Sequence, residues 1–257
     1  MTLLACIGFV ALLLATADSF SPHKAHRSLQ TRPSSSATSS TALPVTIYGH
    51  PGSRSPLVNW ACFELGVNFA MGNLQQNPHP FGQLPCLTDD NDVVVFESGA
   101  ILQYLHQKFA ADKMSPAAAA AVTAWIVWAN ASLDPICFLE TPEGKVYDTG
   151  LRKPNKRINR LEEILQANQK KTGSMWLVPD AGFSCADVAV SSYLLYTLQF
   201  FPTVLQDMSQ WPNVQSYMQA CAKRPNYAKA FGGDVQEFLV EKLQNAPGDK
   251  KKLFGMF

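Results

Sequence analysis

Two short runs of residues carry the clearest chemical signal in the sequence. The first is Phe81–Leu87, in which Pro85 stands between apolar residues at the start of a predicted strand. A proline at that place is suited to a turn that presents free backbone groups. The second is Glu97–Leu105, in which Glu97 and Ser98 open an amphipathic helix. The N–H groups at such a helix start, together with two polar side chains, can hold a charged small molecule.

The elements that must position these runs follow from periodicity and turn residues. Strands are predicted at 45–48, 67–71, 85–88 and 93–96, and helices at 56–65 and 97–109. Ser55 and Pro56 supply the N-cap and a first-turn proline of the earlier helix, which stops at Gly66. The resulting order is β-α-β followed by β-β-α.

After Asp112 the pattern changes to helical segments. Helices are expected at 117 to about 139, 155 to about 171, 188–198, from Trp211 to near Arg224, and at 234–243. Ser184 and Asp187 form a variant of the capping box in front of the most apolar of these helices. A second, all-helical half is therefore predicted.

The two runs resemble the glutathione-binding half of the glutathione transferase family. That family has a thioredoxin-like N-terminal domain with a cis-proline before its third strand and a Glu-Ser or Gln-Ser pair at the next helix. The later phrases 176–178, 183–187, 211–214 and 223–225 also match the family's helical domain. The resemblance extends from Val45 to about Phe231. It implies an α/β thioredoxin-like domain at 43–112 and an all-α domain at 113–245.

A glutathione enzyme must hold a thiolate near neutral pH, although a free Cys has a pKa of about 8.5. A hydrogen bond to the anion and a helix N-terminus both lower that pKa. In serine-type transferases the loop position held here by Ser53 carries the hydroxyl that donates to the glutathione sulfur, so the resemblance implies Ser53 as the catalytic residue. Tyr48 stands where tyrosine-type members place their phenol and remains the competing candidate.

Three neighbours of Ser53 have other interpretations. Ser55 is expected to be a helix cap. Arg54 falls about where cysteine-type members keep their cysteine, which argues against a mixed-disulfide mechanism, and Cys62 lies too far into the helix to replace that cysteine.

The resemblance also implies how glutathione is held. Leu84, just before Pro85, would pair its backbone N–H and C=O with the cysteinyl unit, like an added strand. Glu97 and Ser98 would take the γ-glutamyl ammonium and carboxylate, with Gln83 as a weaker member of the group. The alternative for Glu97 and Ser98 is simple helix capping.

One stretch departs from the family pattern. Between Phe69 and Pro80 there are only ten residues, where the family usually has a further helix with a Lys, His or Arg for the glycine carboxylate of glutathione. The stretch 70–79 contains amides and His79 but no Lys or Arg. His79 or an amide would have to serve that carboxylate, or glutathione is held in another way.

The leading hypothesis is conjugation of glutathione thiolate to an apolar electrophile, with peroxide reduction or isomerisation as related outcomes. No metal or tightly bound cofactor is expected. The electrophile would lie between the two halves, although the aromatics there are as readily explained as core: Trp125, Trp128, Phe138, Tyr193 and Phe200. By resemblance the protein is expected to be a homodimer. The alternative is a non-catalytic ligand-binding or partner-docking module on the same scaffold.

The first 42 residues read as a leader. Leu3–Ala15 is an apolar run of signal-peptide length, with a predicted cleavage after Ser19. Residues 20–42 are basic, rich in Ser and free of acids, as in a transit peptide. A bipartite plastid presequence of a secondary-plastid alga is predicted, with the secretory pathway as the alternative.

Charge and cysteine usage exclude other classes. The leader carries three of the 21 Lys and Arg residues and one of the 20 Asp and Glu residues, so the remainder is close to balanced and nucleic acid is an unsuitable partner. Residues 246–257 are expected to be a solvated basic tail. Five cysteines remain beyond the leader, with no C-x-x-C, which favours buried thiols over a disulfide framework or a metal site.

Overall fold

The structure, a computed structural model, describes residues 45–152, 155–204 and 208–245. These residues belong to one compact unit that begins at Leu43. The predicted signal peptide at 1–19, the transit-peptide-like segment at 20–42 and the basic tail at 246–257 lie outside the described residues.

A four-stranded mixed sheet forms the first half of the described chain. Its strands are β1 (Val45–Tyr48), β2 (Phe69–Met71), β3 (Cys86–Asp89) and β4 (Val94–Phe96). The spatial order is β2-β1-β3-β4, with β1 and β2 parallel and the other pairs antiparallel. The predicted second strand begins two residues late, at Phe69, because the Val67 N–H donates to the Cys62 carbonyl of the preceding helix at 2.9 Å rather than to a neighbouring strand.

Helices α1 (Ser55–Leu65) and α2 (Ser98–Phe109) pack together against this sheet. The buried face of β1 is apolar, and its Val45 and Ile47 pack in one cluster with Leu57, Val58 and Ile101. Helix α1 ends at Gly66, which takes the left-handed conformation that a glycine C-cap allows. The thioredoxin-like order predicted from the sequence is confirmed.

The connection between β2 and β3 contains only the short turn η1 (Leu74–Gln76). The shortening seen in the sequence therefore leaves this part of the sheet without a helix of its own. Five large apolar side chains of the first half are exposed around it: Met71, Leu74, Phe81, Val94 and Phe96.

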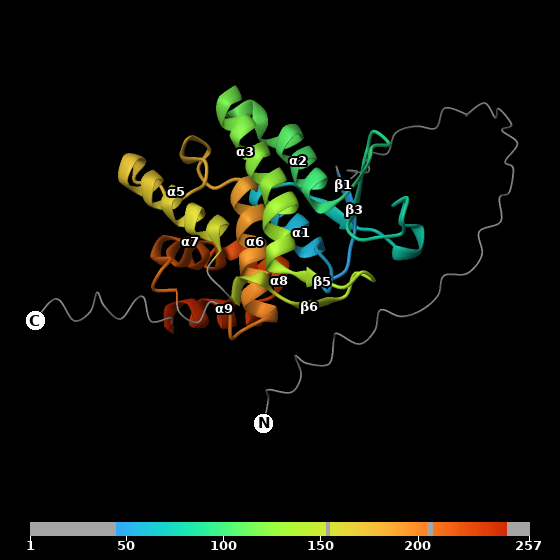
Figure 1. Cartoon of the computed structure of the whole chain (residues 1–257). Helices are drawn as coiled ribbons and strands as arrows, with labels where there is room; N and C mark the ends of the chain where they lie inside the picture. Colours follow the sequence, from blue (N-terminus) through green and yellow to red (C-terminus); the bar gives the residue numbers. More distant parts are fainter. Residues whose placement is uncertain (1–44, 153–154, 205–207, 246–257) are drawn as a thin grey trace, which may run out of the picture. The chain divides into compact units, whose positions relative to one another are not determined.

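The second half is mostly helical (Figure 1). Its helices are α3 (Pro116–Trp128), α4 (Asp134–Cys137), α5 (Lys156–Thr172), α6 (Cys185–Phe200), α7 (Pro212–Ala222), α8 (Pro225–Phe231) and α9 (Gly233–Asn245). The short turns are η2 (Ala111–Lys113), η4 (Gly150–Arg152) and η5 (Pro179–Ala181). The fold class expected from the sequence is confirmed.

Two local features of this half were not predicted. The long helix expected to run to about residue 139 is interrupted by a π-helical turn, η3 (Ala129–Leu133), between α3 and α4. A small hairpin of β5 (Leu139–Glu140) and β6 (Val146–Asp148) follows it. A π turn widens the helix by one residue, and such turns are frequent at functional sites.

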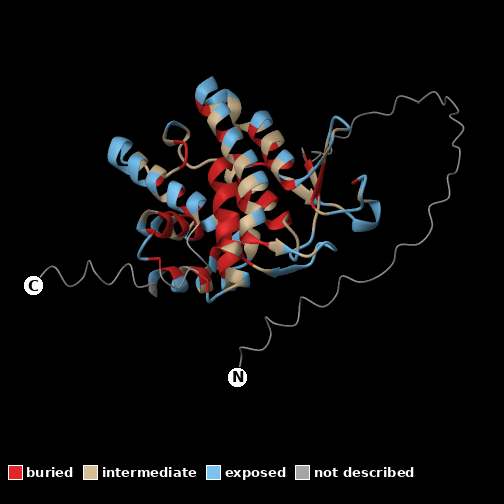
Figure 2. Cartoon of the chain, in the orientation of Figure 1, coloured by how far each residue is buried: buried red, intermediate tan, exposed pale blue. Residues whose placement is uncertain are grey.

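Helix α6 is the buried centre of the helical half. Every residue from Cys185 to Leu198 is buried, which is why the helix is almost continuously red in Figure 2. The predicted capping box at its start is present, with the Asp187 carboxylate accepting from the Ser184 N–H at 3.0 Å. The same carboxylate accepts from the Leu177 N–H at 3.0 Å, which fixes the preceding loop to the helix.

The continuous helical stretch Pro116–Cys137 has a length and composition that would also suit a membrane span, with a mean hydropathy of 1.3. One face of it is core, since Val122, Ile126, Ala129 and Leu133 are fully buried. Only 28% of its most apolar window is buried, however, so much of this apolar helix faces outward.

Helix α1 joins the two halves, because it packs against α2 on one side and against α6 and α8 on the other. Near the C-terminus of α1, Glu64 accepts hydrogen bonds from two nitrogens of Arg224, at 2.9 and 2.7 Å. Glu64 also accepts from the Trp60 indole at 2.8 Å, and the guanidinium lies 3.7 Å from the centre of the Phe183 ring. The Glu64 side chain is only 9% exposed, so its charge depends on this one cation.

Removal of Arg224 should therefore weaken the joint between the halves. Arg224→Met leaves the Glu64 carboxylate buried without a cation, and we expect a loss of about 2–3 kcal/mol in the free energy of unfolding in urea. Arg224→Lys keeps the charge but loses the paired geometry and should lose about half as much.

Arg152→Met is the matched control, because Arg152 pairs with Asp148 at the surface, where the two side chains are 48% and 35% exposed. It should change the unfolding free energy by less than about 0.5 kcal/mol. Equal losses for the two Met variants would contradict this view of the joint.

Candidate functional site

Three segments predicted to form a site meet at one end of the sheet. Tyr48 pairs with Cys86, and Cys86 pairs with Phe96, so the last residue of β1, the first of β3 and the last of β4 lie side by side. The loop after Tyr48, the Leu84–Pro85 segment before β3 and the Glu97–Ser98 turn after β4 are therefore neighbours. The sheet register thus places these three segments at one end of the sheet.

The Leu84–Pro85 peptide bond is cis, as the resemblance implied. Pro85 is buried, Leu84 is half-buried and Gln83 is exposed. Leu84 lies just beyond the last pair of the β1–β3 ladder, so its backbone is placed to pair with an extended ligand. Asn77 buttresses this segment from the β2–β3 connection, because its Nδ2 donates to the Gln83 carbonyl at 2.9 Å. No pattern in the sequence predicted that role.

Glu97 has a left-handed backbone, with φ of 67°, which is unusual for a non-glycine residue. It is the N-cap of α2, but its side chain makes no capping hydrogen bond, and it is exposed. Simple capping therefore does not explain its carboxylate. The turn holds a charged side chain outward beside the N–H groups at the start of a 12-residue helix.

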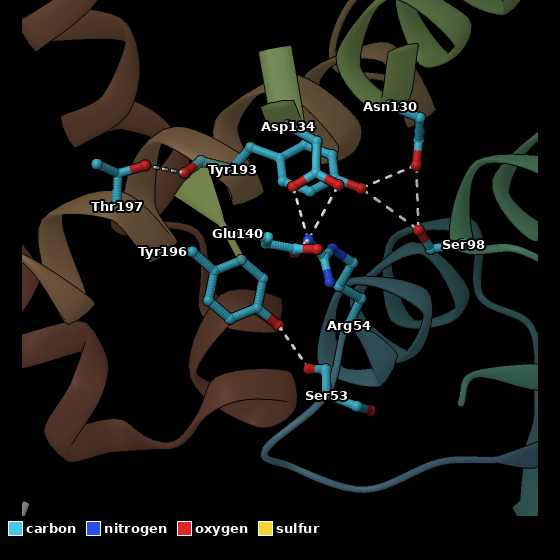
Figure 3. A network of polar contacts seen from close by, with 9 residues as sticks. All are labelled: Ser53, Arg54, Ser98, Asn130, Asp134, Glu140, Tyr193, Tyr196 and Thr197. Atoms are coloured by element: carbon cyan, nitrogen blue, oxygen red, sulfur yellow. Dashed lines mark hydrogen bonds and ion pairs between the residues drawn. The ribbon is translucent and has the colours of Figure 1, made fainter. Parts of the chain in front are cut away.

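Ser98 is buried and contacts the helical half (Figure 3). Its Oγ donates to Asn130 Oδ1 at 3.1 Å, and that oxygen also accepts from the Tyr193 hydroxyl at 2.8 Å. Asn130 belongs to the π turn, and its Nδ2 donates to the Ile126 carbonyl at 2.9 Å. Gly99 makes room for the amide, since a Cβ there would lie 2.5 Å from Asn130 Nδ2. Asn130 is a lone amide in an apolar helix, which is the signal that could have indicated this role.

Ser53 lies in a tightly bonded loop. Its Oγ donates to the His50 carbonyl at 2.8 Å, lies 2.6 Å from Ser55 Oγ and accepts from the Ser55 N–H at 3.2 Å. Ser55 is the first residue of α1 rather than its N-cap, so that expectation was wrong. The reason is that the buried Ser55 hydroxyl turns back to accept from the His50 N–H at 3.1 Å.

Tyr48, the other candidate for the catalytic hydroxyl, has its ring against Gly72. Its ring covers Gly72 after β2, where a Cβ would lie 2.5 Å from a ring carbon. Cys62 is fully buried in α1, and burial raises the pKa of its thiol to about 12, so it is no thiolate near neutral pH. All five cysteines of the described chain are buried and free, as predicted.

Arg54, the N-cap of α1, reaches from the Ser53 loop to the helical half. Its guanidinium donates to both carboxylate oxygens of Asp134, at 2.7 and 3.0 Å, and lies 3.7 Å from Glu140 (Figure 3). Burial lowers the pKa of Arg54, but the contact with the Asp134 carboxylate outweighs burial, so the pKa is raised overall. The rings of Phe138 and Tyr193 lie 5.6 and 5.9 Å from the guanidinium carbon. At the position expected for the thiol of a cysteine-type enzyme, this chain therefore has an arginine whose charge is balanced by Asp134.

The helical half also supplies an aromatic wall. The Tyr196 hydroxyl donates to the Ser53 carbonyl at 3.3 Å, and its ring stacks on Phe200, which is 52% exposed. Phe138 meets Phe200 edge-on at 6.1 Å between ring centres. Trp125 and Trp128 do not belong to this wall, because they line a groove of about 460 Å³ between α3 and α5.

Within residues 45–152, 155–204 and 208–245, no group of three or more His, Cys, Asp or Glu side chains is arranged to hold a metal ion.

Two family models match the chain: Glutathione S-transferase, N-terminal domain, over residues 43–107, and Glutathione S-transferase, C-terminal domain, over 118–225. The glutathione S-transferase GstB of Escherichia coli K12 is 27% identical over 176 residues, which cover 65% of this chain and 80% of that protein.

Two solved structures from Phanerochaete chrysosporium have the same fold. Ure2p8, solved with oxidized glutathione, has a TM-score of 0.59 at 20% identity and covers 79% of this chain and 99% of its own. Ure2p5, cocrystallized with 1-(S-glutathionyl)-2,4-dinitrobenzene, has a TM-score of 0.55 at 20% identity and covers 78% and 97%. Together the two matched domains span more than half of the sequence, and the chain therefore belongs to the glutathione S-transferase family.

Proposed function

We propose that the protein is a serine-type glutathione transferase, which adds the glutathione thiolate to an apolar electrophile. The observation that carries the proposal is the convergence of the Ser53 loop, the Leu84 edge and the Glu97–Ser98 turn at one end of the sheet. Relatives of the same fold were crystallised with glutathione species and with a glutathione conjugate.

The γ-glutamyl and cysteinyl parts of glutathione each have a partner in this arrangement. The γ-glutamyl carboxylate would meet the Ser98 N–H at the start of α2, and the ammonium would meet the exposed Glu97 carboxylate. Leu84 would pair its backbone with the cysteinyl unit, with Gln83 and Pro85 setting its position. The sulfur would then lie by the Ser53 loop at the start of α1.

Ser53 can serve the sulfur by a change of hydroxyl direction. Without ligand, its proton is donated to the His50 carbonyl. With a thiolate present, the Ser53 proton can turn from the His50 carbonyl to the sulfur, while Ser55 donates to Ser53 Oγ across their 2.6 Å contact. The bond to the anion and the partial positive charge of the α1 start would both lower the thiol pKa.

The electrophile would lie against Phe138, Tyr196 and Phe200, which form an apolar wall beside this loop. Peroxide reduction or isomerisation would use the same thiolate. The second candidate function, a non-catalytic binding module, is favoured by one observation: the Ser53 hydroxyl is already bonded within its loop.

Ser53→Ala separates the two functions. With 1-chloro-2,4-dinitrobenzene as the electrophile, we expect the substitution to lower kcat/KM by about 100-fold, because it removes the donor to the thiolate. Binding of glutathione, measured by titration, should change little. Tyr48→Phe is the control and should retain its activity, since that ring covers Gly72. Full activity in Ser53→Ala would refute the serine mechanism, and an inactive wild type that binds glutathione would favour the module.

We also propose a homodimer, from two complementary surfaces. The first half exposes Met71, Leu74, Phe81, Val94 and Phe96, and Phe81 is the most exposed at 75%. Residues 55–107 contain no Lys or Arg, and the exposed acids among them are Asp90, Asp92 and Glu97. The groove between α3 and α5 is lined by Trp125 and Trp128 together with Lys156, Arg157 and Arg160. An acidic, apolar face thus matches a basic, apolar groove on a second copy, and a two-fold axis would form both contacts at once.

Phe81→Asp should weaken this dimer, because it places a charge in the most exposed apolar position of the face. We expect the dimer dissociation constant to rise at least about tenfold by analytical ultracentrifugation. Tyr147→Asp is the control, since Tyr147 is also exposed, at 62%, but lies on the β6 hairpin. A monomeric wild type, or equal effects of the two substitutions, would count against the proposed interface.

Plastid targeting stays a prediction from residues 1–42.

A further inference from the structure

The polar groups of the β2–β3 connection bond mainly within the connection itself. Asn73 Oδ1 accepts from the Gln75 N–H at 3.0 Å, and Asn77 Oδ1 accepts from the His79 N–H at 3.1 Å. His79 Nδ1 accepts from the Phe81 N–H at 3.0 Å, and the His79 side chain is 5% exposed. Asn77 Nδ2 reaches out to the Gln83 carbonyl. These neutral contacts shape the connection and hold it beside Leu84.

The chain around this connection is poor in cations. From Ser55 to Gln107, all of which the structure describes, it has no Lys or Arg. Of the exposed acids in this stretch, Glu97 lies at the same end of the sheet as Leu84, whereas Asp90 and Asp92 lie in the β3–β4 turn at the opposite end. The two cations that flank this stretch are both paired. Arg54 binds Asp134 and Glu140, and Lys108 binds Asp89 at 2.8 Å and Asp90 at 3.4 Å.

Glutathione carries two carboxylates, one at each end. The γ-glutamyl carboxylate has a helix start to bind, and its neighbouring ammonium has Glu97. The glycine carboxylate, at the other end, would face the β2–β3 connection, where the side chains are amides and a buried, already bonded imidazole. A carboxylate in such a place keeps its water and gains little from the protein.

We propose that the site recognises the γ-glutamylcysteinyl part of its thiol and does not read a carboxylate on the third residue. The co-substrate class is then γ-glutamylcysteinyl thiols in general, including those whose third residue carries an ester or amide. This inference rests on the proposed function, because it concerns the same site.

The comparison of glutathione with its glycine monoethyl ester tests the inference. The ester keeps every group except the glycine charge. We expect dissociation constants and kcat/KM values for the two thiols to agree within about threefold, with the same agreement at low and high salt. A preference for glutathione of tenfold or more would overturn the inference while leaving the transferase standing. Failure of the wild type to bind either thiol would overturn both.

Variants of the connection identify any group that does read the carboxylate. Asn77→Ala should weaken glutathione and the ester equally, by about three- to tenfold, because Asn77 positions the Gln83–Leu84 backbone and not the ligand. Asn73→Ala is the matched control and should affect neither, since Asn73 bonds only within its own turn. His79→Ala should leave the ratio of the two affinities unchanged. A loss confined to glutathione in Asn77→Ala or His79→Ala would overturn the inference, and the ratio cancels any general loss of folded protein.

Discussion

Helix α1 is held at both ends by ion pairs to the helical half, and these pairs hold the two halves of the molecule in register. At its start, Arg54 forms a two-pronged ion pair with Asp134, and near its end, Glu64 forms another with Arg224. Both partners belong to the helical half. Since α1 also packs on α2 beside the sheet, it cannot shift without disturbing both halves. The loop that carries Ser53 leads directly into this helix, so the helix fixes the end of the loop.

The site is therefore built by the first half and fixed by the second. Ser53 receives a hydrogen bond on its carbonyl from Tyr196, and Ser98 is bonded to Asn130, which is bonded to Tyr193. These contacts use side chains of α6 and of the π turn, so the most buried helix of the molecule sets the geometry of both ends of the γ-glutamylcysteinyl site. The β2–β3 connection stands apart, because its contacts are largely local. This connection would face the third residue of the ligand. It is shorter than the family pattern, and its stretch 70–79 has no Lys or Arg.

The sequence predicted the parts of the fold that depend on local signals. Element boundaries were predictable where residues have strong local backbone preferences, as at Gly66, at Ser184 with Asp187, and in the hairpin around Asp89–Asp92. The grouping of Ser53, Leu84, Glu97 and Ser98 into one site came from a family resemblance, and the strand register places the segments that carry them at one end of the sheet. Long-range pairs were beyond such reasoning: 80 residues separate Arg54 from Asp134, and 160 separate Glu64 from Arg224. The π turn was not predictable from local signals, because Asn130 Oδ1 makes its contacts with distant residues. The predicted N-cap role of Ser55 was wrong, because the Ser55 hydroxyl bonds to the preceding loop.

The proposed binding of glutathione across the end of the sheet, through its γ-glutamylcysteinyl part, can be tested by backbone amide NMR of the isotopically labelled protein during titration with glutathione. We expect saturable shifts of the Leu84 and Ser98 amides and of the Ser53 loop, with the Asn73–Gln76 amides little changed. Saturable shifts confined to the groove between α3 and α5, or none at all at Leu84 and Ser98, would contradict it.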